Sequence, residues 1–209
     1  MRPPIAIVDY EVGNLRSVQK AFEHLGQPAE VTRDPERIAA APAVVLPGQG
    51  AFGTCMEHLG RLGLVETVRA AAHSGRPFLG ICVGMQLLFE GSEESPAVPG
   101  LGVFRGRVVR FPRDQALKVP HMGWNQLHLV GRSDLLAGVA EGAYVYFVHS
   151  YHAVPEEPEV PVATTTYGVE FVSAVARDNV FAGVFHPEKS QQVGLQLLGN
   201  FVRLVREAA

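Results

Sequence analysis

Cysteine is scarce in this chain of 209 residues, which contains only Cys55 and Cys82. Two cysteines can form neither the disulfide framework of a small secreted domain nor a cysteine-rich zinc module. Long apolar runs are lacking too, since no segment has the roughly 18 uninterrupted apolar residues of a membrane span. The start of the chain is short and reaches the acidic Asp9 too soon for a signal peptide. We therefore expect no membrane association and a cytoplasmic location, where thiols stay reduced.

An excess of basic charge is also absent. The chain has 18 Lys and Arg against 21 Asp and Glu, a formal net charge of −3, which gives no reason to expect a nucleic-acid partner. Its 47% of hydrophobic residues are too many for a disordered protein. At roughly 150 residues per domain, the length favours a single domain over residues 1–209.

The first half of the chain alternates short apolar runs with amphipathic segments. Buried strands are predicted by four apolar runs, at residues 5–8, 29–32, 43–46 and 78–81. Apolar residues spaced by three and four predict helices between or after them, at residues 15–25, 62–73 and 84–89. This alternation is typical of βαβ units, which build a parallel sheet covered by helices.

The pattern changes after Gly91 to strand-like stretches joined by turns. These stretches are residues 102–111, 125–130, 143–149, 160–167, 169–177 and 180–185. A final amphipathic helix begins near Ser190. We predict an α/β fold with a mostly parallel central sheet flanked by helices and a β-rich second half. A basic stripe in and just after the first stretch is interpreted as a solvated strand face rather than a docking site; it comprises Arg105, Arg107, Arg110 and Arg113.

A glycine-rich segment follows the third predicted strand. Residues 48–53 spell G-x-G-x-x-G, a pattern that can hold a dinucleotide phosphate at a helix N-terminus. Pro47 interrupts this junction, and the acidic residue expected about 20 positions later is absent. A tight turn that needs glycine is the plain alternative. We favour a third interpretation, in which backbone N–H groups of the loop bind an oxyanion beside another strand end.

The strongest local signal surrounds Cys82. The sequence Gly80-Ile81-Cys82-Val83-Gly84 matches the nucleophile elbow G-x-S-x-G, with sulfur in place of oxygen. A strand is predicted before it and a helix after it, so the thiol would face a helix N-terminus, which lowers a thiol pKa. The Val83 N–H would point to a developing oxyanion. A buried structural thiol is the default for a lone cysteine, and that is our interpretation of Cys55.

A thiolate nucleophile needs a base and a group that orients the base. Among eight histidines, His186 ends the last apolar run and begins His186-Pro187-Glu188. Catalytic groups of α/β enzymes gather at such strand ends, and Glu188 is close enough in sequence to hold the imidazole. An ordinary turn before the final helix is the alternative. Together with the elbow, we favour a triad of Cys82, His186 and Glu188.

These motifs resemble the class I, or triad, glutamine amidotransferases. A closer resemblance, to the glutaminase subunits of imidazole glycerol phosphate synthases, runs along nearly the whole chain, and its most specific motif is residues 120–125, Pro-His-Met-Gly-Trp-Asn. The resemblance implies that glutamine is hydrolysed to glutamate and ammonia through a Cys82 thioester. It also implies a heterodimer with a (β/α)₈-barrel cyclase subunit, which uses the ammonia to make imidazole glycerol phosphate in histidine biosynthesis. No cofactor and no metal are implied.

The same resemblance implies roles for further residues. Oxyanion-hole candidates are Gln49, Gly50 and Val83. Positions near the amino-acid end of bound glutamine are Gln86, Glu94, Ser150 and Tyr151. Positions facing the cyclase or the ammonia path are Asn14, Trp124, Tyr146 and Lys189. Gln49 departs from the family, in which this position is commonly aliphatic. One alternative is an enzyme of another kind, either an amidotransferase that feeds another acceptor or a cysteine hydrolase of related fold. The other is a non-catalytic regulatory or scaffold protein, which the intact triad disfavours.

Overall fold

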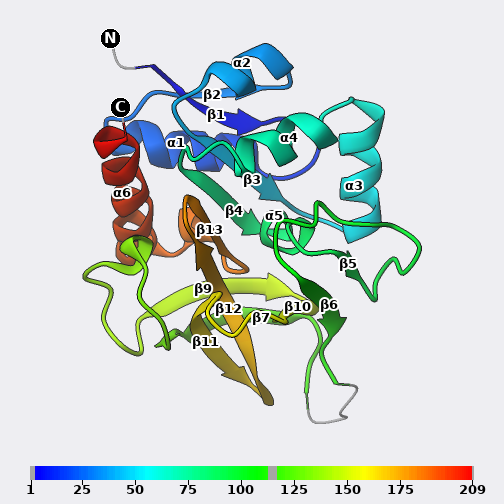
Figure 1. Cartoon of the computed structure of the whole chain (residues 1–209). Coiled ribbons are helices and arrows are strands. Elements are labelled where there is room, and N and C mark those ends of the chain that lie inside the picture. The colour runs from blue at the N-terminus through cyan, green and yellow to red at the C-terminus, as the bar shows by residue number, and fades with distance from the viewer. Residues whose placement is uncertain (1–2, 113–116, 209) are drawn as a thin grey trace.

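The computed structural model describes residues 3–112 and 117–208 (Figure 1). Arg113 of the basic stripe lies outside these residues. Among the described residues, no helix is both long and apolar enough to cross a membrane.

The first half of the chain forms the parallel part of a mixed sheet. Its strands are β1 (Ile5–Val8), β2 (Ala29–Thr32), β3 (Val44–Gly48) and β4 (Phe78–Cys82). They run parallel in the order β2-β1-β3-β4, and β13 (Val180–Gly183) joins next to β4, also parallel. All residues of β1, β3, β4 and β13 are buried, as expected for parallel strands covered on both faces. The predicted α/β fold is confirmed here.

The second half supplies mostly antiparallel strands. They are β5 (Gly91–Ser92), β6 (Gly106–Arg110), β7 (His121–Gln126), β8 (His128–Leu129), β9 (Tyr144–His149), β10 (Tyr151–Pro155), β11 (Pro161–Tyr167) and β12 (Val169–Arg177). The main sheet continues from β13 through β12, β10 and β6 to β5, and β11 pairs with β12 and β8. Strands β7 and β9 form a separate antiparallel pair. The predicted β-rich second half is confirmed.

Two groups of helices flank the parallel strands (Figure 1). The helices are α1 (Leu15–His24), α2 (Pro35–Ala40), α3 (Phe52–Arg61), α4 (Val65–Ala72), α5 (Val83–Leu87), α6 (Gln191–Glu207) and the 3₁₀ turns η1 (Asp134–Leu136) and η2 (Pro187–Lys189). The contact between α1 and α6 includes Phe22 and Phe201, whose ring centroids are 6.1 Å apart. On the other side, α4 contacts α2, α3 and β3.

Several elements differ from those predicted. The glycine loop expected over residues 48–53 ends at Ala51, and helix α3 occupies residues 52–61, where no helix is predicted. Its apolar face consists of Phe52, Cys55, Met56 and Leu59, at helical spacing. The strand expected at 125–130 begins earlier, at His121, and is divided into β7 and β8. Strand β10 was also missed, because its apolar and polar residues do not alternate regularly.

Candidate active site

Cys82 occupies a strained turn between β4 and α5. Its backbone has φ 54° and ψ −115°, a left-handed conformation that residues with a side chain rarely adopt. The residue is 3% exposed, and its Sγ lies 4.0 Å from the Val148 carbonyl oxygen. The sharp strand-to-helix turn expected of a nucleophile elbow is therefore present.

The elbow also brings two backbone segments unusually close. A Cβ added at Gly84 would lie 1.9 Å from the carbonyl oxygen of Leu46 in β3, a separation that atoms cannot adopt without moving the backbone. Glycine is thus required here for the approach of α5 to the neighbouring strand.

We expect Gly84→Ala to lower the free energy of unfolding by about 2 to 3 kcal/mol, because the new methyl group displaces the backbone of β3. Urea denaturation measures this change. The matched control is Gly60→Ala, since Gly60 lies in α3 with no atom within 4 Å of an added Cβ. That control should change the free energy little, or raise it by up to about 1 kcal/mol. Equal stability of the two variants would refute the close approach.

His186 lies beside Cys82 because β13, the strand before His186, is the neighbour of β4, the strand that ends at Cys82. Strand β13 pairs in parallel with β4, with Gly183 opposite Ile81, so both strands end at the same edge of the sheet. The backbone N–H of His186 donates to the Tyr146 carbonyl at 2.9 Å, and the Ser190 hydroxyl donates to the His186 carbonyl at 2.6 Å. These bonds fix the turn after β13.

The His186 ring contacts Glu188 on one side and the thiol region on the other. Its Nδ1 lies 2.9 Å from Glu188 Oε1, and Nε2 is buried with no hydrogen-bond partner among the described residues. Burial by itself lowers the pKa of His186, but the Cys82 and Glu188 side chains raise it, to about 10. The Cys82 side chain is therefore close enough to the His186 ring to interact with it electrostatically.

The glycine loop lies on the opposite side of Cys82 from His186. Gly48, the last residue of β3, pairs with Cys82 in register. Two buried side chains from elsewhere contact the loop's carbonyl groups: the Tyr10 hydroxyl donates to Pro47 O at 2.5 Å, and Cys55 Sγ lies 3.5 Å from Gln49 O. The loop is thus held by Cys55, which is the buried structural thiol expected from the sequence, and by Tyr10, for which no role was predicted. Burial raises the pKa of Cys55 to about 11, so this thiol stays protonated at neutral pH.

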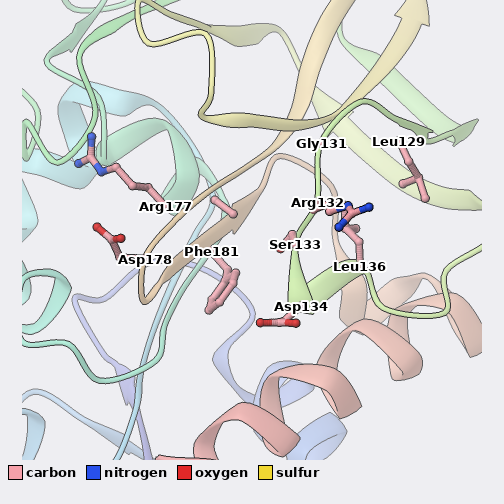
Figure 2. A pocket seen from close by; sticks show the side chains of 10 residues that line it. Leu129, Gly131, Arg132, Ser133, Asp134, Leu136, Arg177, Asp178 and Phe181 are labelled. Carbon is pink, nitrogen blue, oxygen red and sulfur yellow. The ribbon is translucent and has the colours of Figure 1, made fainter.

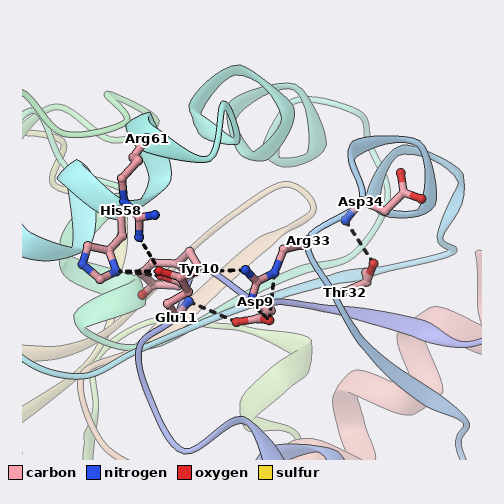
Figure 3. A network of polar contacts seen from close by, with 8 residues as sticks. All are labelled: Asp9, Tyr10, Glu11, Thr32, Arg33, Asp34, His58 and Arg61. Carbon is pink, nitrogen blue, oxygen red and sulfur yellow. Dashed lines mark hydrogen bonds and ion pairs between the residues drawn. The ribbon is translucent and has the colours of Figure 1, made fainter.

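A surface network holds the segment that carries Tyr10 (Figure 3). Arg33 Nη2 pairs with Asp9 Oδ2 at 2.6 Å and Arg33 Nη1 with Glu11 Oε1 at 2.9 Å, while Arg61 pairs with the other Glu11 oxygen. His58 Nδ1 lies 3.1 Å from the Tyr10 carbonyl oxygen. Exposed ion pairs of this kind contribute little individually. Here they connect the segments that follow β1 and β2 with helix α3.

Most of the predicted site residues line a single cavity of about 310 Å³, within the usual range for small-molecule sites. Its lining comprises Gln49, Gly50, Cys82, Val83, Gln86, Glu94, Pro120, Val148, His149, Ser150, Tyr151 and His186. Nine of these were predicted from sequence, and Pro120, Val148 and His149 were not. Glu188 lies behind His186, outside the lining.

The side chains of two polar residues in this cavity form hydrogen bonds with the protein backbone. The Gln86 amide donates to the Tyr151 carbonyl at 3.1 Å. Glu94 Oε2 accepts from the backbone N–H of Phe52 at 2.8 Å, at the first turn of α3. Both side chains are therefore held in place by residues distant in sequence.

The four residues expected to face a partner or the ammonia path lie apart from this cavity. Three of them cluster: the Trp124 and Tyr146 rings are 6.0 Å apart, and Lys189 Nζ lies 5.8 Å from the centre of the Tyr146 ring. Asn14 lies at the start of α1, where Oδ1 accepts from the Ser17 N–H at 3.3 Å. It is not part of the cluster.

A larger cavity, of about 440 Å³, lies elsewhere, between η1 and the turn joining β12 to β13 (Figure 2). Arg177 lines it, but the guanidinium is already paired with Glu157 at 2.9 Å and lies over the Phe104 ring. The lining contains no cysteine and no histidine. Its size therefore does not make it the site of chemistry, which requires a nucleophile beside a base.

The chain is similar to known proteins over nearly its whole length. The family described as glutamine amidotransferase class-I matches residues 6–204. Imidazole glycerol phosphate synthase subunit HisH of Syntrophotalea carbinolica is 55% identical over 202 residues, covering 94% of this chain and 98% of the relative. The subunit HisH of Moorella thermoacetica is 53% identical over 205 residues, covering 98% and 97%.

Solved structures of low sequence identity share the fold. A glutamine amidotransferase superposes with a TM-score of 0.74 at 22% identity, covering 96% of this chain and 98% of that one. PurLQS from Thermotoga maritima gives a TM-score of 0.74 at 18% identity, covering 99% of both chains.

Proposed function

This chain belongs to the class I glutamine amidotransferases and, within them, to the HisH subunits of imidazole glycerol phosphate synthase, and we propose that Cys82, His186 and Glu188 hydrolyse glutamine to supply ammonia to a cyclase subunit. One observation carries the proposal. Three adjacent parallel strands, β3, β4 and β13, end together and bring the glycine loop, the thiol and the imidazole to one cavity.

The first step is attack of the Cys82 sulfur on the amide carbon of the glutamine side chain. The His186 imidazole takes up the thiol proton, and Glu188 holds the ring by its Nδ1–H at 2.9 Å. A carbon–sulfur bond forms, and the carbonyl oxygen becomes an oxyanion. The Val83 N–H and the backbone of Gln49 and Gly50 would stabilise this oxyanion, and one such donor lowers the barrier by about 3 kcal/mol.

The intermediate then collapses to a thioester. The carbon–nitrogen bond breaks while the imidazolium gives its proton to the departing nitrogen, which leaves as ammonia. Water next attacks the thioester with His186 as base, releasing glutamate and restoring the thiol. Atoms and protons balance with glutamine and water as the only reactants.

The cavity contains groups suited to the amino-acid end of glutamine. Glu94 would attract the α-ammonium group, while Gln86 and the backbone of Ser150 and Tyr151 would contact the α-carboxylate. The hydrogen bonds between Glu94 and the Phe52 N–H and between Gln86 and the Tyr151 carbonyl support these roles, because they hold both side chains in position for the substrate.

The cyclase would dock on the outer face of the β7–β9 pair. Met122, Trp124 and Tyr144 are 63%, 45% and 54% exposed there, and a cluster of exposed large apolar residues typically marks an interaction surface. Tyr146 and Lys189 lie beside this face. Docking would keep ammonia from protonation in bulk water. We further propose that residues 1–209 act as one domain and that the enzyme is cytoplasmic.

The test is glutamine hydrolysis by the purified chain alone, with a (β/α)₈-barrel cyclase, and with the cyclase plus its nucleotide substrate. We expect little activity from the chain alone and a large rise with both additions, with ammonia appearing in imidazole glycerol phosphate rather than in solution. A high rate without a partner, or a rise that is independent of the cyclase, would contradict the proposed partnership.

A further inference from the structure

A pair of buried histidines has no role in the proposed chemistry: His149 is part of the cavity lining, and its partner His121 lies outside the lining. His121 on β7 and His149 at the end of β9 are 3% and 6% exposed. They are partners in register across the two strands, and His121 Nδ1 lies 3.0 Å from His149 Nε2. Tyr167 stacks on His121, with ring centroids 4.0 Å apart.

The bonds at both ends of this pair fix where the protons lie. At one end, His149 Nδ1 is 2.9 Å from the Tyr151 carbonyl oxygen, which only accepts, so Nδ1 carries a proton. At the other, Asn125 Oδ1 accepts from the Gln126 N–H at 2.8 Å, which leaves its Nδ2 to donate to His121 Nε2 at 3.2 Å. In the neutral pair, therefore, His121 donates from Nδ1 to His149 Nε2.

The chain of bonds runs in one direction, from Asn125 through His121 and His149 to Tyr151 O, and requires both rings to be neutral. A second proton on either ring would place two N–H groups against each other. Burial lowers the pKa of His121 to about 4 and that of His149 to about 3. A positive charge on His121, His152 or His186 would also disfavour a charged His149, whereas its bond to the Tyr151 carbonyl favours it. Four aromatic rings also pack against the pair: Phe111, Phe147, Tyr167 and Phe171.

The chain of bonds ends on the segment that faces Cys82. Tyr151 O accepts from both His149 Nδ1 and the Gln86 amide. The four residues 148–151 all line the cavity. Removing the His149 bond would leave this carbonyl held by Gln86 alone and would change the surface offered to glutamine.

We propose that His121 and His149 are positioning residues, a neutral pair of fixed tautomers that holds residues 148–151 in the conformation that binds glutamine. This rests on the proposed function, because it assigns a purpose to the wall of the same cavity. Neither ring touches the reacting atoms, so substituting either histidine should change the KM for glutamine more than kcat.

The variant His121→Phe keeps the stacking volume but removes both ring nitrogens. We expect it to raise the KM for glutamine about tenfold, the cost of a lost buried hydrogen bond. His121→Asn places an amide N–H near the position of Nδ1, so its KM for glutamine should lie within about threefold of that of the unmodified enzyme. The matched control is His152→Phe, because His152 is another buried imidazole against Phe111 but lies outside the chain of bonds. The KM of this control for glutamine should stay within about twofold of that of the unmodified enzyme.

NMR of the unmodified chain, labelled at histidine nitrogen and carbon, tests the pair without any variant. We expect His121 and His149 to carry the proton on Nδ1 and to remain neutral down to about pH 5, where ordinary histidines are charged. A proton on Nε2 of either ring would overturn the inference. So would equal KM values for His121→Phe and His152→Phe. Absence of glutaminase activity in the unmodified chain with its cyclase would instead refute the proposed function, and the tautomers would still be measurable.

Discussion

Replacing Cys82 with alanine is expected to lower glutamine hydrolysis by roughly 10⁴-fold or more, because the reaction loses its nucleophile and not merely an auxiliary contact. The measurement is glutamate release in the presence of the cyclase and its substrate. Alanine keeps the left-handed backbone that Cys82 already adopts, with φ 54°, so the loss should come without unfolding.

The second thiol provides a matched control. Cys55 lies 3.5 Å from the Gln49 carbonyl, so Cys55→Ala loses a weak contact and should keep hydrolysis within about tenfold of the unmodified enzyme. Binding of Cys82→Ala to the cyclase, measured by sedimentation, should be unchanged. Undiminished hydrolysis by Cys82→Ala would eliminate the proposed mechanism.

Glu188→Gln should lower kcat by roughly 10²- to 10⁴-fold. The amide preserves the shape of the carboxylate but removes the charge that stabilises the imidazolium, and its NH2 group can donate to Nδ1 and so favour the other tautomer of the ring. The carboxylate favours the charged ring, whereas burial favours the neutral ring, so its removal must lower the pKa of His186 from about 10.

Histidine NMR over a range of pH measures that change directly. In the unmodified chain the His186 ring should stay charged well above neutral pH, and in Glu188→Gln it should lose its proton at lower pH. Glu157→Gln serves as control, because Glu157 is 13% exposed and paired with Arg177, away from the cavity. An unchanged kcat in Glu188→Gln, or an unchanged His186 titration, would show that Glu188 does not orient the base.

The sequence was most informative where the proposed chemistry depends on residues that are close to one another along the chain. The elbow around Cys82 and the segment His186-Pro187-Glu188 each fit within five residues, and the structure places both at adjacent strand ends. A strand followed at once by a helix constrains the turn so strongly that the residue types at fixed offsets reveal it.

The contacts that could not be predicted from the sequence act across long separations. Tyr10 donates to Pro47 O, 37 positions away, and His121 contacts His149, 28 positions away. Such contacts depend on strand order and register, which a single sequence does not specify. Helix α3 was missed for a different reason: the glycines in its first and last turns, Gly53 and Gly60, obscured its apolar face.

The central claim, that Cys82 carries the acyl group of glutamine, is tested most directly by trapping the intermediate. The enzyme with its cyclase is mixed with glutamine, stopped in acid within the turnover time, and analysed by mass spectrometry of its peptides. We predict a glutamyl group, glutamine minus ammonia, on the peptide containing Cys82 and none on that containing Cys55. Continued turnover with no adduct at Cys82, or with an adduct elsewhere, would contradict the mechanism.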